Sequence, residues 1–225
     1  MTLASLTYRL VDLWMKKFSS VRFVGPILAD SPDYERVMKF RADQNRLRAP
    51  YLEDDVQLEI ERRLRLDERS LHFVLERSGE IAASVRVTPP PFEFSALSPI
   101  LENRAEEFAG YYEFGRLCTD VALGRKAIYA GLLVIKAAQH VFLHEMASGI
   151  VGVCRAERVS YMKKLGLNVD GEPAFVPSRQ AAYRVIHGSK DHLIAFYYDF
   201  FLKLFSRART SKDSAAEVSH ESRPA

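Results

Sequence analysis

Cysteine is scarce in this chain, with 2 among 225 residues, so the sequence has no disulfide framework. Cys118 and Cys154 both lie in apolar runs, which is typical of reduced, buried thiols. No stretch approaches the roughly 20 apolar residues that span a bilayer. The N-terminal residues do not predict a signal peptide, because Arg9, Asp12 and Lys16 interrupt their apolar pattern. We therefore expect a cytoplasmic protein.

An excess of charge of either sign is also lacking. The chain has 32 Lys and Arg against 29 Asp and Glu, a net charge of +3, which does not favour a nucleic-acid partner. Hydrophobic residues make up 48% and charged residues 27%, the balance of an ordinary globular protein with a sizeable core. The length fits one large domain or two small ones, and the composition excludes collagen-like and fully disordered chains.

Metal ligation has little support in the sequence. His140 and His144 stand four residues apart in a predicted helix and so share a face. Glu145 does not complete the His-Glu-x-x-His motif, and no third ligand is evident. We therefore predict no metal site.

The hydrophobic pattern predicts an α/β or α+β protein with a single sheet. Strands are predicted over 21–28, 71–75, 81–87, 111–121, 149–154 and 181–186, and helices over 2–18, 53–67, 128–146, 157–164 and 193–205, with a further helix beginning after Ser31.

Both ends of the chain carry additions to the main domain, which spans 20–190. Residues 1–19 contain an amphipathic helix, and 191–205 form a strongly aromatic one. Core packing is the first interpretation of the aromatic helix, with a homodimer contact or a membrane surface as alternatives. Residues 206–225 lack periodicity, which predicts a disordered tail.

A basic turn joins the strand over 111–121 to the long helix. The N-terminus of a helix suits a phosphate, because free N–H groups and the positive end of the helix dipole point there. Arg125 and Lys126 would add positive charge. An ordinary turn with solvated basic residues explains the same pattern, so both interpretations stay open.

The order of strand, basic turn, long helix, strand and short helix resembles the GNAT acyltransferase superfamily over about residues 20–188. Tyr161 falls on the family's Tyr position, and Leu165-Gly166-Leu167 matches the ending of its last helix. The resemblance implies a GNAT-like mixed, mostly antiparallel sheet flanked by helices. It also implies a splayed centre where the strands over 111–121 and 149–154 meet.

The resemblance also implies that the basic turn receives the phosphate and pantetheine of the donor. The residues at this place are Arg125, Lys126, Ile128 and Tyr129. The sequence departs from the family's loop, Arg/Gln-x-x-Gly-x-Gly/Ala, because Ile128 replaces the first glycine.

Asp67, Arg86, Glu113 and Arg116 resemble a pattern of the branch that uses acyl carrier protein (ACP) as its donor. That branch contains acyl-homoserine-lactone (autoinducer) synthases and N-acyl amino acid synthases. The lactone synthases also carry an early Arg–Phe–Trp set, which is not matched because the only tryptophan, Trp14, lies far upstream. The chain is therefore more similar to an N-acyl amino acid synthase.

The implied reaction moves a fatty acyl group from an acyl-ACP thioester to the amine of an amino acid or similar small acceptor. Glu113 would be the base, and the Tyr161 hydroxyl would provide a proton or a hydrogen bond to the leaving thiolate. Gly115 is a plausible bulge that aims a backbone N–H at the oxyanion. Arg86 or Arg116 could bind an acceptor carboxylate, or serve as a structural anchor.

Other interpretations stay open for each of these residues. Glu113 and Arg116 could form a structural ion pair, and Tyr161 could pack on the sheet. Cys118 is placed at the substrate site, although a buried, inert thiol explains it as well. The arginines of 62–65 could be a solvated face or could meet an acidic carrier protein.

Two other functions also remain open at this stage. One is a GNAT N-acetyltransferase that uses acyl-CoA, and the other is a GNAT-like binding module without activity. We expect no bound cofactor, with acyl-ACP or acyl-CoA as co-substrate.

Overall fold

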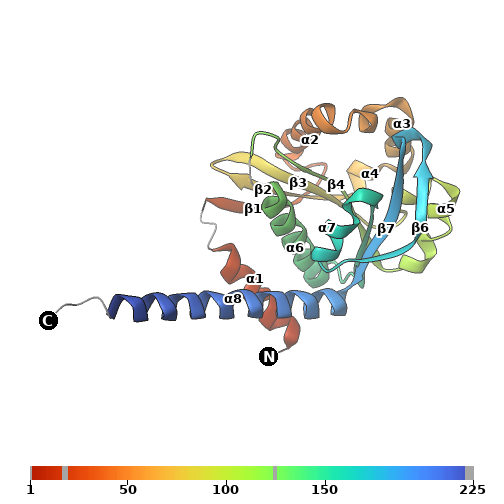
Figure 1. Ribbon diagram of the computed structural model, residues 1–225. Coiled ribbons are helices and arrows are strands. Elements are labelled where there is room, and N and C mark those ends of the chain that lie inside the picture. Colours follow the sequence, from red (N-terminus) through yellow and green to blue (C-terminus); the bar gives the residue numbers. More distant parts are fainter. Residues whose placement is uncertain (1, 17–19, 124–125, 221–225) are drawn as a thin grey trace.

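One seven-stranded sheet, in the order β1-β2-β3-β4-β5-β7-β6, organises the protein (Figure 1). This computed structural model describes residues 2–16, 20–123 and 126–220. The strands are β1 (Val21–Ile27), β2 (Leu71–Arg77), β3 (Glu80–Thr88), β4 (Tyr111–Thr119), β5 (Gly149–Arg155), β6 (Asn168–Val176) and β7 (Ala181–Ser189). Neighbouring strands are antiparallel except β4 and β5, which are parallel. The predicted mixed, mostly antiparallel sheet is confirmed.

Helices cover both faces of this sheet. The α-helices are α1 (Leu3–Met15), α2 (Tyr34–Arg48), α3 (Asp55–Leu64), α4 (Leu66–Arg69), α5 (Pro99–Glu102), α6 (Lys126–His144), α7 (Val159–Lys164) and α8 (Lys190–His220). Short 3-10 turns are η1 (Pro50–Glu53), η2 (Phe94–Ala96), η3 (Ala105–Phe108), η4 (Ala156–Arg158) and η5 (Pro177–Arg179). The α6 helix packs on one face, while α2, α3, α4 and the short helical turns between β3 and β4 pack on the other.

The long helix α6 forms the centre of the larger core. Its Leu133 and Val141 are fully buried, as are Phe73 and Val85 of the sheet against which it packs. Each buried side chain of this size contributes about 1.5–3 kcal/mol relative to an exposed one. The sequence predicts this burial, because apolar residues occupy most faces of the helix.

The sheet splits between β4 and β5. Their parallel pairing covers three residue pairs and ends where Glu113 lies opposite Val151. Gly152 follows at the point of separation, where a Cβ atom would lie 2.7 Å from the Phe114 carbonyl oxygen. A side chain at this position would push the strands apart, so the glycine permits their close approach.

A bulge in β4 lies beside this split. Ser84 pairs with Cys118 and Arg86 pairs with Gly115, so β4 holds one residue more than β3 across this interval. The sequence predicts the bulge at Gly115, but the left-handed backbone falls on its neighbour Arg116, with φ of 53°. The bulge therefore lies just beyond the expected glycine, between Gly115 and Cys118, where the Arg116 guanidinium pairs with Glu61 and Glu93.

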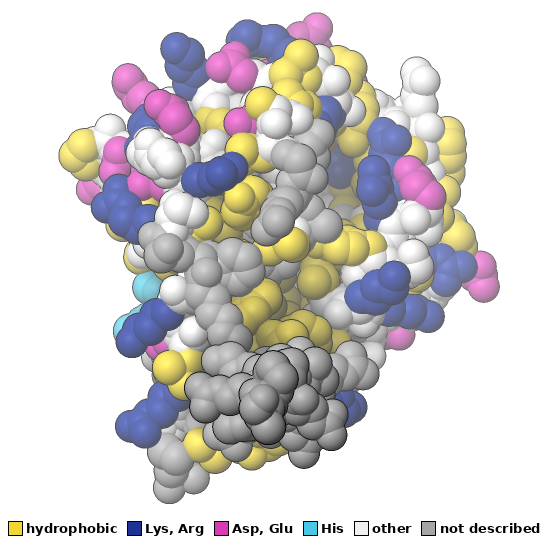
Figure 2. Space-filling view, turned by 60° about the vertical axis from the view of Figure 1, so that its left-hand side comes forward, with side chains coloured by type: hydrophobic (Ala, Val, Ile, Leu, Met, Phe, Trp, Pro, Cys, Tyr) yellow, Lys and Arg dark blue, Asp and Glu magenta, His cyan; other side chains and the backbone are white. Residues whose placement is uncertain are grey.

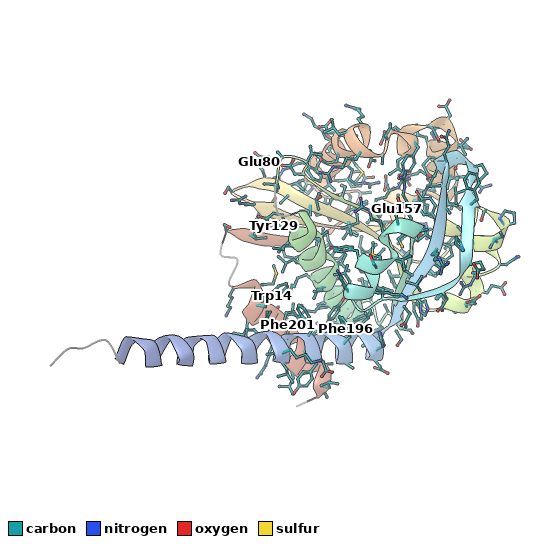
Figure 3. All side chains as sticks on the ribbon, in the orientation of Figure 1. Trp14, Glu80, Tyr129, Glu157, Phe196 and Phe201 are labelled. Carbon is teal, nitrogen blue, oxygen red and sulfur yellow. The ribbon has the colours of Figure 1, made fainter. Side chains whose placement is uncertain are left out.

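The two terminal helices α1 and α8 pack together below α6 (Figures 1 and 3). The rings of Trp14 and Phe201 have centroids 5.2 Å apart, and Phe201 is fully buried. Core packing therefore accounts for one face of the aromatic helix. Phe200, whose ring meets the Trp14 ring edge-on at a centroid distance of 6.4 Å, and Leu202 remain 41% and 44% exposed. Within the described residues, no helix combines the length and apolar character that crossing a bilayer requires.

Two parts of the chain differ from the prediction. Residues 206–220 continue helix α8, where a disordered tail was expected, because no glycine or proline interrupts 190–220 and the segment holds good helix formers such as Ala, Arg and Glu. Strand β6 was missed because Gly171 and Pro173 break its alternation, and both are tolerated since β6 is an edge strand.

Candidate active site

A cavity of about 730 Å³ lies where β4 and β5 part. Its walls come from α2, η1, β4, β5, α6, α7 and β7. Figure 2 shows a hollow with a hydrophobic floor on one side of the molecule, with Lys and Arg side chains on the surface around it. A gap between two strands of one sheet allows such a cavity to reach both faces.

The alternation of β5 shows that the cavity does reach both faces. Ile150 belongs to the core cluster around α6, whereas Val151 and Val153 belong to the cluster on the opposite face. Arg155 lies on that opposite face as well, over the ring of Tyr51 in η1. Ile150, Val151, Val153 and Arg155 all come from β5, and successive side chains of a strand point to opposite faces of the sheet. One strand therefore contributes side chains to the cavity on both faces.

The half of the cavity towards α6 and α7 is apolar. Its lining consists of Phe114, Leu117, Ala130, Val134, Ile150, Cys154, Met162, Leu165, Leu167 and Ile186, together with the aromatic ring of Tyr161. Such a lining suits a hydrocarbon chain.

The half towards α2 and η1 is polar and rich in arginine. Its lining includes Gln44, Asn45, Arg48, Tyr51, Glu93, Glu113, Arg116, Arg155, Arg179 and Tyr183. This half suits a polar reactant that approaches from the opposite face of the sheet.

Arg86 is the centre of a charge network beneath the polar half. Its side chain is 1% exposed. Its Nη1 atom donates to Glu61 Oε1 at 3.0 Å and to Asp67 Oδ1 at 2.8 Å, and its Nη2 atom donates to Glu93. Burial alone would lower the pKa of Arg86, but these carboxylates outweigh it and raise that pKa above its usual value.

Three further arginines extend this network. Arg41 Nη1 donates to Asp67 Oδ1 at 2.8 Å. Arg116 Nη2 lies 3.2 Å from Glu93 Oε1, and Arg179 Nη2 donates to the same oxygen at 2.5 Å. In all, Arg41, Arg86, Arg116 and Arg179 face the carboxyl groups of Glu61, Asp67, Glu93 and Glu113. Each of these four buried guanidinium groups therefore has at least one carboxylate partner.

Two carboxyl groups on the cavity wall have opposite pKa shifts. Burial and the neighbouring Glu93 carboxylate raise the pKa of Glu113 to about 7. Burial opposes ionisation of Glu93 too, but the guanidinium groups of Arg116, Arg86 and Arg179 outweigh it and lower the pKa of Glu93 to about 2. Glu113 is therefore the carboxyl group that can exchange a proton near neutral pH.

Tyr161 and Cys118 both remain protonated at neutral pH. Burial raises the pKa of the Tyr161 phenol on α7. Burial also raises the pKa of the Cys118 thiol, which lies 3.2 Å from Ser84 Oγ. A thiol with a raised pKa is a poor nucleophile, whereas a protonated phenol is a good hydrogen-bond donor.

The fold has clear counterparts among solved structures. No protein-family model matches the sequence, and no curated protein matches it either. The structure of TofI in its apo form has a TM-score of 0.57 and 14% identity, over 79% of this chain and 96% of that one. FeeM, an N-acyl amino acid synthase from uncultured soil microbes, has a TM-score of 0.51 and 12% identity, over 75% and 91% of the two chains.

A putative acetyltransferase of the GNAT family from Desulfovibrio desulfuricans has a TM-score of 0.52 and 11% identity, over 75% of this chain and 98% of that one. The chain has the GNAT acyltransferase fold. At these identities the likeness establishes the architecture, while the chemistry must be argued from the cavity itself.

The GNAT fold brings five of the predicted site residues to one cavity. Glu113, Gly115, Arg116, Cys118 and Tyr161 all line it, from β4 and α7. These residues span nearly 50 positions of the sequence, and the split between β4 and β5 is what unites them.

Other predicted residues of the GNAT site lie elsewhere. Arg86 lies outside the cavity lining, and its guanidinium group forms ion pairs with Glu61, Asp67 and Glu93. Ile128 is 39% exposed and Tyr129 is buried in the core on α6 (Figure 3), and neither belongs to the lining. Arg125 lies outside the described residues, as does the side chain of Lys126, so their phosphate-binding role stays a prediction.

Sequence reasoning missed part of the site. Neither Glu93 nor Arg179 lies in any of the predicted strands or helices. Their ion pair joins positions 86 residues apart, so no local spacing could reveal it. Gln57 completes this group, because its side chain bonds both residues. Among the residues described here, no group of three or more His, Cys, Asp or Glu is arranged to hold a metal ion.

Proposed function

We propose that this protein is an N-acyltransferase that moves a fatty acyl group from a thioester to the amine of a small acceptor. One observation carries the proposal. The cavity at the split between β4 and β5 joins an apolar half to a polar half, and a carboxyl group whose pKa is about 7 lines it. A lipid thioester and a polar amine could thus meet through the sheet.

Glu113 is the proposed base. The attacking nitrogen must lose a proton as it forms the amide bond, and a group whose pKa lies near the working pH accepts it best. Both oxygens of Glu113 accept backbone hydrogen bonds, from the N–H groups of Glu93 and Phe94. The carboxyl group is thereby held in place, and we propose that a water molecule relays the proton to it.

Tyr161 is the proposed partner of the leaving thiolate. When the nitrogen attacks the thioester carbon, the C–S bond breaks and the sulfur takes up negative charge. The protonated Tyr161 hydroxyl can donate to that sulfur. The oxyanion formed on the same carbon needs a second donor, and the bulge between Gly115 and Cys118 offers backbone N–H groups outside the regular ladder.

We further propose acyl-ACP as the donor and an amino acid as the acceptor class. Asp67, Arg86 and Arg116 join Glu113 in one buried network, so the residues that resemble the ACP-dependent branch lie together. The likeness to FeeM, an N-acyl amino acid synthase, supports the same choice. The second candidate is acyl-CoA-dependent N-acetylation, which the fold of the Desulfovibrio protein favours equally.

A donor comparison separates these candidates. The purified chain is incubated with myristoyl-ACP, myristoyl-CoA or acetyl-CoA and a mixture of amino acids and polyamines, and N-acyl products are identified by mass spectrometry. Myristoyl-ACP should give the highest kcat/KM. Preference for acetyl-CoA would replace the donor assignment. Absence of any N-acyl product with every donor would support the binding module without activity.

A further inference from the structure

Three arginines stand at the polar end of the cavity, outside the buried network. Arg48 is the last residue of α2, Arg155 the last of β5 and Arg158 the last of η4. All three line the cavity. Arg155 and Arg158 are three residues apart in the sequence, whereas Arg48 lies more than 100 positions earlier, and the fold brings all three to the lining of one cavity.

These arginines lack the counter-ions that the buried ones have. Among the described residues, neither Arg48 nor Arg158 forms an ion pair with a carboxylate, and both are exposed. Arg155 has a single acidic neighbour, Glu157, at a loose 3.8 Å. In the network beneath them each carboxyl group faces at least one buried guanidinium group, so the network adds no surplus of negative charge. The mouth of the polar half is therefore positively charged.

Neighbouring groups hold two of the three guanidinium groups in position. Arg48 Nη1 donates to Thr119 Oγ1, at the end of β4, over 3.2 Å. The Arg155 guanidinium lies over the Tyr51 ring, 4.9 Å from its centroid. A planar guanidinium held in one orientation is suited to binding a carboxylate through paired hydrogen bonds.

We infer that the acceptor carries a carboxylate and that Arg48, Arg155 and Arg158 bind it. The inference rests on the proposed function and gives its acceptor a specific binding site. It also moves the anchoring role away from Arg86 and Arg116, whose charges Glu61 and Glu93 already neutralise. A polyamine acceptor would be repelled by these positively charged arginines. An amino acid amide would lack the carboxylate that the arginines bind.

Kinetics with matched acceptors test the inference. In Arg48→Gln and Arg158→Gln, KM for glycine should rise about 10- to 100-fold, the loss expected for a charge-assisted hydrogen bond, with little change in kcat. KM for glycinamide should not change. Arg46→Gln is the control, because Arg46 is an exposed residue of the same helix, paired with Asp43 and outside the cavity lining.

A binding measurement keeps the inference independent of catalysis. Calorimetric titration with N-myristoylglycine and with N-myristoylglycinamide compares the carboxylate with its neutral amide in the absence of chemistry. The wild type should bind the acid at least tenfold more tightly, and the Arg48→Gln, Arg158→Gln double variant, which keeps only Arg155, should lose most of this preference.

Two results would overturn the inference. Equal binding of acid and amide by the wild type would show that no carboxylate site exists. A rise in KM for the acyl donor, with KM for glycine unchanged, would assign these arginines to the carrier protein. If no acyl transfer occurs with any donor, the proposed function fails, while the titration still decides whether the carboxylate site exists.

Discussion

The carboxyl group of Glu113 accepts a hydrogen bond from the backbone N–H of Glu93, and the pKa values of the two side chains are shifted in opposite directions. Three guanidinium groups hold Glu93 ionised, and its charge in turn helps to keep Glu113 protonated up to about pH 7. One buried carboxylate thus tunes another.

Acyl transfer should depend on pH through Glu113. The protonated carboxyl cannot accept a proton, so ionisation of Glu113 should by itself raise kcat/KM about tenfold from pH 6 to pH 8. Glu113→Gln should remove this rise and lower the rate by about 10²- to 10⁴-fold. Deprotonation of the acceptor amine also increases the rate with pH, and the variant measures that contribution separately. An unchanged profile in the variant would remove the base role.

The same pKa makes a prediction about stability. Because folding raises the pKa of Glu113 from 4.5 to about 7, its contribution to the free energy of unfolding is complete below about pH 4.5 and is lost as the pH rises through 7. Thermal denaturation of the wild type and of Glu113→Gln at pH 5 and pH 8 should show the variant gaining stability relative to the wild type at the higher pH. A constant difference between the two proteins would contradict the raised pKa.

Replacing Glu93 should affect both stability and the base. Glu93→Gln leaves Arg86, Arg116 and Arg179 without their shared carboxylate, so the free energy of unfolding should fall by about 3–5 kcal/mol. The negative charge beside Glu113 disappears as well, so the pH profile of acyl transfer should move to lower pH. Glu93→Asp keeps the charge and should keep the profile. If the pH profile of Glu93→Gln is the same as that of the wild type, the charge of Glu93 does not raise the pKa of Glu113.

The role of Tyr161 can be tested through the leaving group. Tyr161→Phe should lower kcat about 10²-fold with a pantetheine thioester, because the alkyl thiolate loses its hydrogen-bond donor. With a thiophenyl ester the leaving thiolate is more stable, and most of the loss should disappear. Tyr129→Phe is the control, since Tyr129 lies in the core outside the cavity lining. Equal losses with both esters would indicate that the Tyr161 hydroxyl does not act on the leaving group, and no loss with either ester would indicate that Tyr161 serves packing alone.

The two aromatic faces of α8 should differ in their contribution to stability. Phe201 is fully buried, so Phe201→Ala should lower the free energy of unfolding by about 3–5 kcal/mol. Phe200 is 41% exposed, and Phe200→Ala should cost less than about 1 kcal/mol. Urea denaturation of both variants measures the difference. A large loss in Phe200→Ala would contradict this difference and would indicate that the edge-on contact of Phe200 with Trp14 contributes as much as burial of Phe201.

The apolar half of the cavity should set the acyl chain length. Val134 lies on α6 and contributes to this lining. Val134→Phe reduces the space and should shift the preferred donor towards shorter acyl chains, while Val134→Ala should tolerate longer ones. Competition among acyl-ACP donors of different lengths, read by mass spectrometry, measures the preference. If both variants keep the wild-type preference, the acyl chain lies elsewhere.

The architecture was largely predictable from the sequence because its periodicity is strong where the core is. The apolar faces of α6 and the hairpin of β2 and β3 mark the centre of the sheet directly. Strand β6 carries no such signal, because it is an edge strand interrupted by glycine and proline. The helical segment 206–220 shows the reverse case, since helix propensity without amphipathic periodicity extends α8.

The site was predictable only in part, because its chemistry depends on contacts between distant positions. Glu113, Arg116 and Tyr161 follow from a family resemblance, and the structure gathers them at one cavity. The contacts that set the protonation state of Glu113 could not be predicted from the spacing of residues in the sequence. Glu93 sets the pKa of Glu113, and partners from three separate segments hold Glu93. The neutralisation of Arg86 by its carboxylates was equally invisible in the sequence.

The most direct test of the account is a single-turnover reaction of myristoyl-ACP with an amino acid mixture at pH 8, in the wild type and in Glu113→Gln. Intact N-myristoyl amino acid is measured by mass spectrometry, and the released carrier thiol is measured in the same samples. We predict one N-acyl product per thiol released by the wild type, and a rate at least about 10²-fold lower in the variant. Thiol release without an N-acyl product, or equal rates in both proteins, would contradict acyl transfer to an amine with Glu113 as the base.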